Sequence, residues 1–271
     1  MESGRVSEAP SRGSKRSQDM DRIWETHLGK EVPYDVQYHD NVRLEIASFI
    51  SEPPGLILDI GCGAGAAGKV IKKKFPGARV IGIERNPWAA DLARTALDEV
   101  ICADLHDVDL RSRLGSVHVD LVLLLDILEH LYDPWRTLLR IRDWLEPGTR
   151  VLASAPNVRN LETLDALASG HWDYAANGVL DITHLRFFTK PSFRRLFEET
   201  GYRVLDVTPL LRTEPIDLHV VSRRPGRIAT RNVSIAVRDL DDLEDLYAMQ
   251  YLIDARVADA IAPAPTAEPP D

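Results

Sequence analysis

The stretch Leu56-Ile57-Leu58-Asp59-Ile60-Gly61-Cys62-Gly63-Ala64-Gly65 decides the fold. Strand-forming residues run into an acid, three glycines follow at alternate positions, and apolar residues at helical spacing come next (Ala66, Val70, Ile71, Phe75). This order predicts a buried parallel strand that turns sharply into a helix, the place where open α/β sheets bind nucleotide-like ligands. Glycine suits such a turn because it tolerates a positive φ and lets a ligand lie against bare backbone.

Two kinds of ligand compete for this turn. Gly61-x-Gly63-x-x-Ala66 fits the dinucleotide pattern, and Glu84 follows about twenty residues later, as a ribose-binding acid should. Asp59 argues against a dinucleotide, because a carboxylate just before the turn repels a pyrophosphate but serves a ligand that carries an ammonium and a sulfonium. With Asp104, three successive strands end in acids, which resembles the S-adenosylmethionine (SAM) site of class I methyltransferases. The alternative for any one acid is that it caps a helix.

Composition limits the class of protein. The 271 residues can bury one large core, and 44% hydrophobic with 28% charged residues is typical of a soluble globular chain. Its longest strongly apolar run, 119–128, is too short to span a bilayer. No signal peptide is expected in the polar first twenty residues, and two cysteines, Cys62 and Cys102, exclude a disulfide framework; both observations predict a cytoplasmic protein. The net charge of −9 argues against nucleic acid as a general partner.

Strands and helices alternate along the middle of the chain. We expect strands at 56–60, 79–84, 99–104, 119–125, 151–155 and 202–207, and helices after Gly65, from Pro87 through Leu97, from Pro134, and from a cap at Ser192. Repeated βα units predict a doubly wound, mostly parallel Rossmann-like sheet with helices on both faces. The expected organisation is a disordered tail at 1–20, one domain at 21–260 with lid helices at 21–50 and an insertion at 158–190, and a disordered tail at 261–271.

Residues 211–260 give a weaker signal. Segments 218–221 and 233–237 have strand character, while 251–257 fits either a strand or a helix. The acids between Asp239 and Asp245 predict a solvated helix or loop.

Chemistry is expected in the loops beyond the carboxyl ends of the strands. The segment 126–134 holds Asp126, Glu129 and His130, which share one side of a helical turn if the segment is helical. Three interpretations remain open: the three side chains bind a metal, His130 is the base that takes a proton from the methyl acceptor, or Glu129 and His130 only begin a helix.

A second candidate constellation lies in the insertion. It comprises 170–174, with Trp172 and Tyr174, and 180–189, with His184 and Arg186. Flat aromatic surfaces beside polar groups suit a polar acceptor such as a sugar. His184 is the second candidate base, and Arg186 is a candidate ligand for a substrate carboxylate or phosphate, with a structural role as the alternative.

Together these stretches resemble class I SAM-dependent methyltransferases of the ubiquinone-type O-methyltransferase-like group, especially the branch associated with bacterial polysaccharide and glycosyltransferase clusters. The resemblance runs from Tyr38 to Val207 through the segments Tyr38–Arg43, LILDIGCGAG, VIGIERNP, DILEHLYDPW, SAPN, GHWDY and LDITHLRFFT. The last two segments carry most of its specificity. In the related ubiquinone-pathway enzymes a Glu-x-x-Glu-His segment binds a divalent metal, whereas here the first acid is Asp126.

The resemblance implies SAM in the glycine cleft, a lid that includes Tyr38 and Arg43, and a magnesium or manganese ion at Asp126, Glu129 and His130. The predicted cofactor residues are Asp59, Gly61, Cys62, Gly63, Gly65, Glu84, Arg85, Asp104, Leu105 and Asp126. The predicted substrate residues are Tyr38, Arg43, Asn157, Trp172, Tyr174 and Arg186.

The sequence therefore predicts an O-methyltransferase that acts on a sugar or glycan precursor, with His130 or His184 as base. Three rivals remain: methylation of a small phenol or carboxylate, a SAM-binding partner of a biosynthetic enzyme without catalysis of its own, and a dehydrogenase. Oligomeric state is not predicted.

Overall fold

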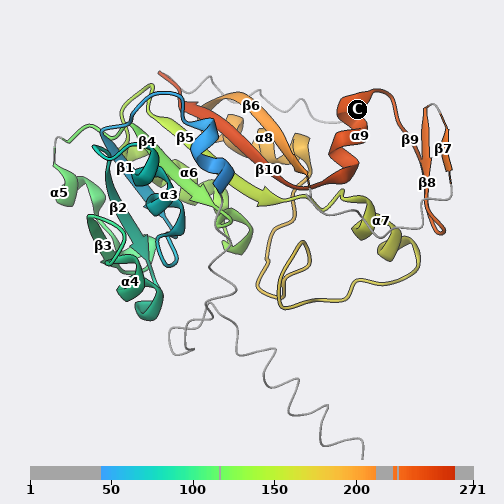
Figure 1. Cartoon of the computed structure of the whole chain (residues 1–271), viewed down its shortest axis with the longest axis horizontal. Helices are drawn as coiled ribbons and strands as arrows, with labels where there is room; N and C mark the ends of the chain where they lie inside the picture. The colour runs from blue at the N-terminus through green and yellow to red at the C-terminus, as the bar shows by residue number, and fades with distance from the viewer. Residues whose placement is uncertain (1–43, 116, 212–221, 225, 260–271) are drawn as a thin grey trace, which may run out of the picture.

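A computed structural model describes residues 44–115, 117–211, 222–224 and 226–259, and its main feature is a seven-stranded sheet (Figure 1). The strand order is β3-β2-β1-β4-β5-β10-β6. Five strands and β6 run parallel, while β10 is antiparallel to both its neighbours, β5 and β6. The expected doubly wound, mostly parallel sheet is confirmed. The strands are β1 (Leu56–Ile60), β2 (Arg79–Glu84), β3 (Glu99–Cys102), β4 (Leu121–Leu125), β5 (Arg150–Pro156), β6 (Tyr202–Leu211) and β10 (Ala248–Val257).

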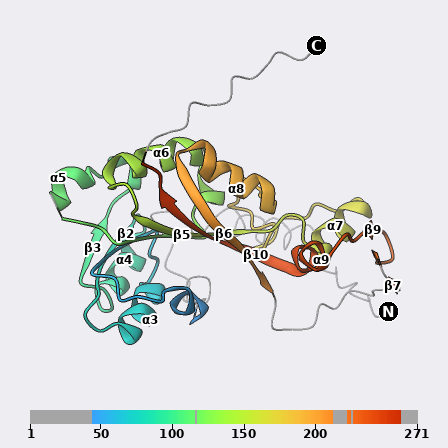
Figure 2. The same cartoon turned by 90° about the horizontal axis from the view of Figure 1, so that it is seen from above.

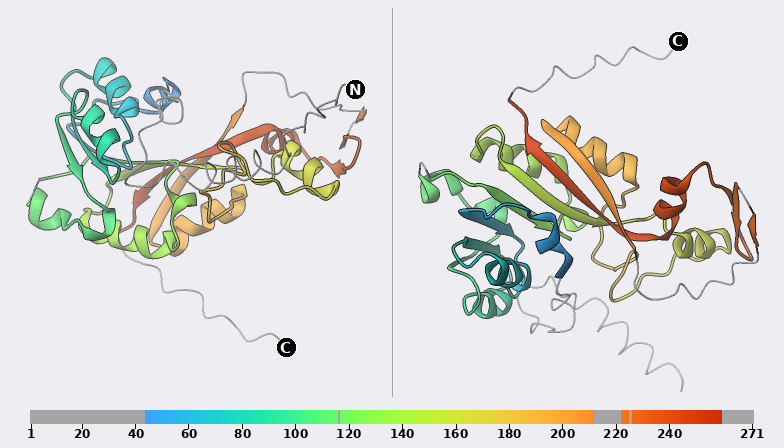
Figure 3. Two further views of the ribbon diagram at one scale, coloured as in Figure 1. Left: turned by 90° about the horizontal axis from the view of Figure 1, so that it is seen from below. Right: turned by 45° about the horizontal axis from the view of Figure 1, so that its top comes forward.

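Helices cover both faces of the sheet. Figure 2 shows α5 (Leu110–Leu114), α6 (Pro134–Trp144) and α8 (Lys190–Glu199) on one face, with α3 (Ala66–Lys74) and α4 (Pro87–Ala93) on the other, and Figure 3 shows the same layers from below. Every residue of β1 is buried: Leu56, Leu58 and Ile60 join the core on one face, and Ile57 joins the core on the opposite face. A strand buried on both faces reads as a continuous apolar run, which is why β1 was recognisable from the sequence.

Three local expectations need correction. Helix α8 is capped by Thr189 rather than Ser192; Ser192 is three residues inside, where its hydroxyl accepts the Thr189 N–H in a capping box. Helix α4 ends at Ala93, short of Leu97, which instead packs its side chain under the glycine turn. Strand β3 ends at Cys102, so Asp104 lies in the following loop as the cap of a short 3₁₀ turn, η2 (Leu105–Asp107).

Residues 211–260 contribute strand β10 to the main sheet and also form part of a small unit beside that sheet. The part at 251–257, which the sequence left open, belongs to β10. Strands β7 (Ser222–Arg224), β8 (Arg227–Ala229) and β9 (Ser234–Ala236) form a small antiparallel sheet, and 218–221 lies outside the described residues. We call β7–β9, α7 (Leu161–Ala168) and α9 (Leu240–Tyr247) the accessory unit; it shares a small core and lies beyond one end of the main sheet (Figure 1).

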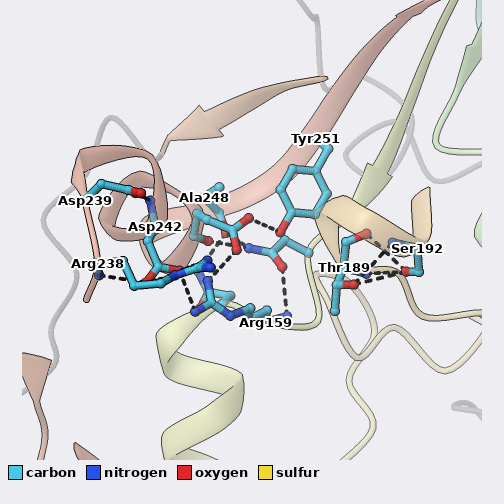
Figure 4. Close-up of polar contacts among 11 residues, drawn as sticks. Arg159, Thr189, Ser192, Arg238, Asp239, Asp242, Ala248 and Tyr251 are labelled. Carbon is cyan, nitrogen blue, oxygen red and sulfur yellow. Dashed lines mark hydrogen bonds and ion pairs between the residues drawn. The ribbon is translucent and has the colours of Figure 1, made fainter. Parts of the chain in front are cut away.

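The prediction of a solvated helix or loop at 239–245 is right only in part: the segment forms α9, and Asp239 and Asp241 are exposed. Asp242 and Asp245 on α9 are buried, and Arg159, just before α7, pairs with both (Figure 4). Tyr251 on β10 donates its hydroxyl hydrogen to Asp245. A buried carboxylate needs such partners to offset its desolvation. This polar cluster ties the accessory unit to the beginning of β10.

Candidate functional site

A cavity of about 880 Å³ opens at the carboxyl ends of β1 to β4. The loops after these four strands line one part of it, as expected for an open α/β sheet. The other part is lined by Tyr132, by the insertion (Ala176, Asn177, Gly178, Val179, Asp181, His184, Leu185) and by Met249 and Gln250 of β10. The cavity thus joins the predicted cofactor loops to residues from the second half of the chain.

The glycine turn forms the floor of the cofactor side. Gly61 has φ +72° and donates its N–H to Ile83 O at 2.7 Å, so the turn is bonded directly to β2. Gly61, Cys62 and Gly63 line the cavity, as do the predicted Arg85 and Leu105. Gly65 does not line it; with φ +82° it caps α3, where a Cβ would lie 3.1 Å from the Leu97 side chain.

All three predicted acids, Asp59, Glu84 and Asp104, line this side of the cavity. Burial first, and then the charge of Glu84, raises the pKa of Asp59 to about 7, and Asp59 Oδ2 has no hydrogen-bond partner within the described residues. Burial also raises the pKa of Glu84, against the opposing effect of the Asn86 and Gly63 N–H groups. Asp104 accepts the His106 N–H at 3.0 Å, so it both caps η2 and borders the cavity.

Asp126 sits between the two sides of the cavity in an uncommon conformation. Its φ is +54°, a region that non-glycine residues rarely adopt. Ser154 Oγ donates to Asp126 Oδ1 at 2.8 Å and accepts the Asp126 N–H at 3.1 Å. Gln250 Nε2 donates to the same carboxyl group at 3.2 Å. The Asp126 side chain is therefore held in the lining of the cavity by β5 and β10.

The two candidate bases lie side by side in the cavity wall. The His130 and His184 rings are 4.8 Å apart, edge to face. His184 Nδ1 lies 3.0 Å from Val179 O, and burial lowers the pKa of the His184 imidazole although the Val179 carbonyl and Asp181 act in the opposite direction. His130 Nδ1 lies 2.9 Å from Thr183 Oγ1. The sequence named these histidines as alternatives, and the structure brings them together.

The predicted metal set is not assembled as expected. Within the described residues, the group whose ligand atoms approach one another, all within 4.8 Å, is Glu129, His130 and His184, without Asp126. Glu129 and His130 lie on η3 (Leu128–His130), a 3₁₀ turn in which Asp126 does not take part. Two imidazoles and one carboxylate do not fit magnesium or manganese, which prefer oxygen ligands. No step is therefore assigned to magnesium or manganese.

Several predicted substrate residues do not line the cavity. Asn157 is fully buried, and its amide nitrogen donates to Asp245 O and Ala248 O. Trp172 packs edge to face on Phe187, and Tyr174 is 52% exposed. Arg186 donates to Tyr132 O and lies over the Tyr132 ring. Tyr38 and Arg43 lie outside the described residues.

Other cavity residues were missed from the sequence. Tyr132 stands inside the quoted DILEHLYDPW segment and was overlooked there, while Asn177 and Asp181 stand between and within the two quoted segments of the insertion. Gln250 carries no local signal, because it reaches the cavity only through the pairing of β10 with β5.

Comparisons with known proteins agree with this geometry. A family model described as a methyltransferase domain matches residues 34–207. The ubiquinone biosynthesis O-methyltransferase of Coxiella burnetii (strain RSA 331 / Henzerling II) is 26% identical over 196 residues, which is 70% of this chain and 81% of that protein. The enzyme of the same name from Nitrobacter winogradskyi is 30% identical over 160 residues, 55% of this chain and 57% of that one.

Solved structures share the fold. A SAM-dependent methyltransferase from Archaeoglobus fulgidus aligns with a TM-score of 0.54 at 18% identity, covering 88% of this chain and 99% of that chain. A Haloferax volcanii methyltransferase, solved with the activator Trm112 and described there as putative, aligns with a TM-score of 0.56 at 15% identity, covering 92% and 99%. No helix in the described part of the chain is long and apolar enough to cross a membrane. The chain belongs to the methyltransferase domain family and is a SAM-dependent methyltransferase.

Proposed function

We propose that this methyltransferase methylates a hydroxyl oxygen of a sugar or glycan precursor, with His130 as the general base. The observation that carries the proposal is the paired imidazoles of His130 and His184, 4.8 Å apart in the wall of a cavity that also holds the acid-lined cofactor side. A sugar hydroxyl is a weak nucleophile, so a positioned base is the group that its methylation requires.

The cofactor side has the chemistry to hold SAM, which supplies a methyl group on a positively charged sulfur. In our proposal Glu84 accepts hydrogen bonds from the ribose hydroxyls, Asp104 accepts from the adenine amino group, and Asp59 and Asp126 face the cationic amino acid end. The buried Asp59 oxygen, which has no hydrogen-bond partner among the described residues, supports this assignment, because a cationic ligand would compensate the cost of its burial. Gly61, Cys62, Gly63, Arg85 and Leu105 border the same ligand.

The two histidines have different surroundings, which support different roles for them. Burial disfavours a positive charge on His184, since it lowers the pKa of that imidazole. His130 is only half-buried, and its Nδ1 faces Thr183, which is bonded in turn to Asp181. We therefore assign proton removal to His130 and orientation of the acceptor hydroxyl to His184.

The acceptor side carries polar groups beside apolar ones. Asn177, Asp181 and Gln250 line it together with Val179, Leu185 and Met249, whereas Trp172 and Tyr174, which would have made an aromatic slot, do not. Several hydrogen-bonding groups around one cavity favour a polyhydroxylated acceptor. The second candidate is a small non-sugar metabolite such as a phenol; its support is the name of the relatives, which are O-methyltransferases of ubiquinone biosynthesis.

The test is transfer of labelled methyl from SAM to a panel of nucleotide sugars, glycans and phenols, with and without EDTA. The enzymes are wild type, His130→Ala, His184→Ala and the control His118→Ala, which removes an exposed imidazole outside the cavity. Label on a sugar that persists in EDTA and falls at least about 100-fold in His130→Ala is the expected result. Label on phenols alone would favour the second candidate, and loss of transfer in EDTA would contradict a metal-free base. SAM binding without transfer to any acceptor would favour a non-catalytic partner.

A further inference from the structure

We infer that Asp181 and Thr183 are positioning residues that hold the His130 ring in the tautomer with its proton on Nδ1. The inference rests on the proposed function, in which His130 is the base. It concerns a chain of three side chains, Asp181, Thr183 and His130, that crosses from the insertion to the loop after β4.

The direction of each hydrogen bond follows from the donors available. Thr183 N–H donates to Asp181 Oδ1 at 2.8 Å, and Thr183 Oγ1 donates to the same oxygen at 2.6 Å. A hydroxyl has one hydrogen, so the hydrogen of Thr183 Oγ1 is committed to Asp181. Thr183 Oγ1 then faces His130 Nδ1, 2.9 Å away, with a lone pair.

A second contact agrees with this direction. The Thr183 carbonyl oxygen, which can only accept, lies 3.3 Å from the same His130 Nδ1. Because both Thr183 oxygens act as acceptors toward Nδ1, this nitrogen carries the proton, and in the neutral ring the lone pair is on Nε2. Nδ1 of the neighbouring His184 likewise meets an acceptor, Val179 O at 3.0 Å.

The hydrogen-bonded series of Asp181, Thr183 and His130 is held in place at its Asp181 end and at its His130 end. Asp181 is 2% exposed and Thr183 is 7% exposed, so water has little access to compete for these bonds. The backbone N–H groups of Leu185 and Arg186 both donate to Glu129 O, at 2.8 and 3.0 Å, which sets the insertion in register with the turn that carries His130. This contact places Thr183 beside the turn that carries His130.

The consequence for the reaction is a defined path for one proton. The acceptor O–H bond gives its proton to His130 Nε2, the oxygen keeps the electron pair that forms its bond to the methyl carbon, and the sulfonium sulfur keeps the pair of the bond that breaks. The ring is then an imidazolium whose Nδ1–H still donates to Thr183, and the Asp181 carboxyl group stands behind it to offset the new charge. A ring in the other tautomer would present an N–H to the acceptor oxygen and could not take its proton.

The test compares Thr183→Val, which removes the nearer hydroxyl acceptor with little change of shape and leaves only the 3.3 Å carbonyl contact, with Thr183→Ser, which keeps the hydroxyl. The matched control is Thr208→Val, which breaks another Thr–Asp hydrogen bond, to Asp206, far from the cavity in the sequence and outside its lining. Each full-length enzyme is studied by ¹⁵N imidazole NMR, with the His130 signals assigned by their loss in His130→Gln, and by steady-state kinetics with the acceptor found above.

We expect the proton of His130 on Nδ1 in wild type, a shift toward Nε2–H in Thr183→Val, and the wild-type tautomer in Thr183→Ser. The kcat of Thr183→Val should fall about 10–100-fold with the KM for SAM unchanged, and serine should restore most of it. An Nε2–H wild-type ring, an unshifted tautomer in the valine variant, or an unchanged kcat would overturn the inference. If the tautomers are as expected but His130→Ala keeps full turnover, the proposed base is wrong while the positioning of the ring stands.

Discussion

Glu84, at the end of β2, accepts the backbone N–H of Gly63 at 3.0 Å across 21 residues of chain. Its other carboxylate oxygen accepts the Asn86 N–H at 2.7 Å. One acid thus joins the glycine turn after β1 to the loop after β2, and it does so at the wall of the cavity. The geometry of the turn and the placement of the proposed ribose ligand depend on the same side chain.

Glu84→Gln should weaken SAM binding by about 10–100-fold, because an amide N–H then opposes one of the two backbone N–H groups and the charged acceptor is lost. Isothermal titration with SAM and with its demethylated product measures the change. The matched control is Glu99→Gln on β3. This variant removes an exposed acid that pairs with Arg79 of β2, and it should bind SAM as wild type does. Equal affinity of the Glu84 variant and wild type would exclude the proposed ribose contact.

Asp59 makes the stability of the ligand-free protein depend on pH. Burial raises its pKa from 3.8 to about 7, so between these values the folded state binds a proton that the unfolded state releases. Stability from this group is complete below about pH 4 and is lost as pH rises through 7. Relative to Asp59→Asn, wild type should lose about 2–3 kcal/mol of unfolding free energy between pH 5 and 7.5.

Urea unfolding of both proteins at several pH values checks this prediction. Asp91→Asn, at an exposed carboxyl group on α4, should follow the wild-type curve. If wild type and Asp59→Asn keep a constant difference across the range, Asp59 does not hold its proton near neutrality.

The contrast between β1 and β10 explains how much of the fold the sequence predicts. Strand β1 is signalled by its own residues, a short apolar run that ends in glycine, and its predicted bounds are correct. Strand β10 lies between β5 and β6 and pairs with strands that come much earlier in the chain: Ile253 pairs with Ala153 of β5 and with Val207 of β6. Because those pairings define it, local periodicity left 251–257 undecided.

The candidate site, too, was predictable where the signal is local and unpredictable where it depends on distant parts of the chain. The acids Asp59 and Glu84 were predictable since each lies at the carboxyl end of its own strand, and parallel strands bring these ends to one edge. Which residues beyond β5 face that edge was not predictable. Asn157 was predicted to contact substrate from its place after β5, yet its amide donates to Asp245 O and Ala248 O, from a segment about ninety residues away. His130 and His184 likewise come together through contacts between segments far apart in the chain, such as the Leu185 N–H that donates to Glu129 O.

Gly61→Ala should damage both folding and binding. Its φ of +72° is strained for alanine, and the added Cβ would lie 1.9 Å from Ile127 Cδ1. We expect a loss of about 2 kcal/mol or more of unfolding free energy and no measurable SAM binding. Gly77→Ala is the control, since that Cβ meets nothing within 4 Å and φ is not positive there; its unfolding free energy should stay within about 0.5 kcal/mol of wild type. An equally stable Gly61 variant would contradict the role given to this turn.

Arg159 is predicted to stabilise the accessory unit through the two acids of α9. Its guanidinium pairs with Asp242 at 2.9 Å and with Asp245, whose carboxylate also accepts the Tyr251 hydroxyl (Figure 4). Arg159→Met keeps the length of the side chain but leaves two buried carboxyl groups without this cation, so unfolding free energy should fall by about 2–3 kcal/mol. Urea unfolding of Arg159→Met and of wild type measures the difference.

The matched control is Arg194→Met, which breaks an exposed pair with Glu198 on α8 and should cost less than about 0.5 kcal/mol of unfolding free energy.

The two variants also separate an effect on stability from an effect on substrate binding. The Arg159 cluster holds the beginning of β10, where Met249 and Gln250 line the acceptor side of the cavity. Arg159→Met should therefore raise the KM for the acceptor more than it weakens SAM binding, because most of the proposed SAM ligands lie in the loops after β1 to β3 and only Asp126 is held by Gln250 of β10. A loss of SAM binding that equals the loss of acceptor binding would show that the accessory unit supports the whole cavity rather than its acceptor side.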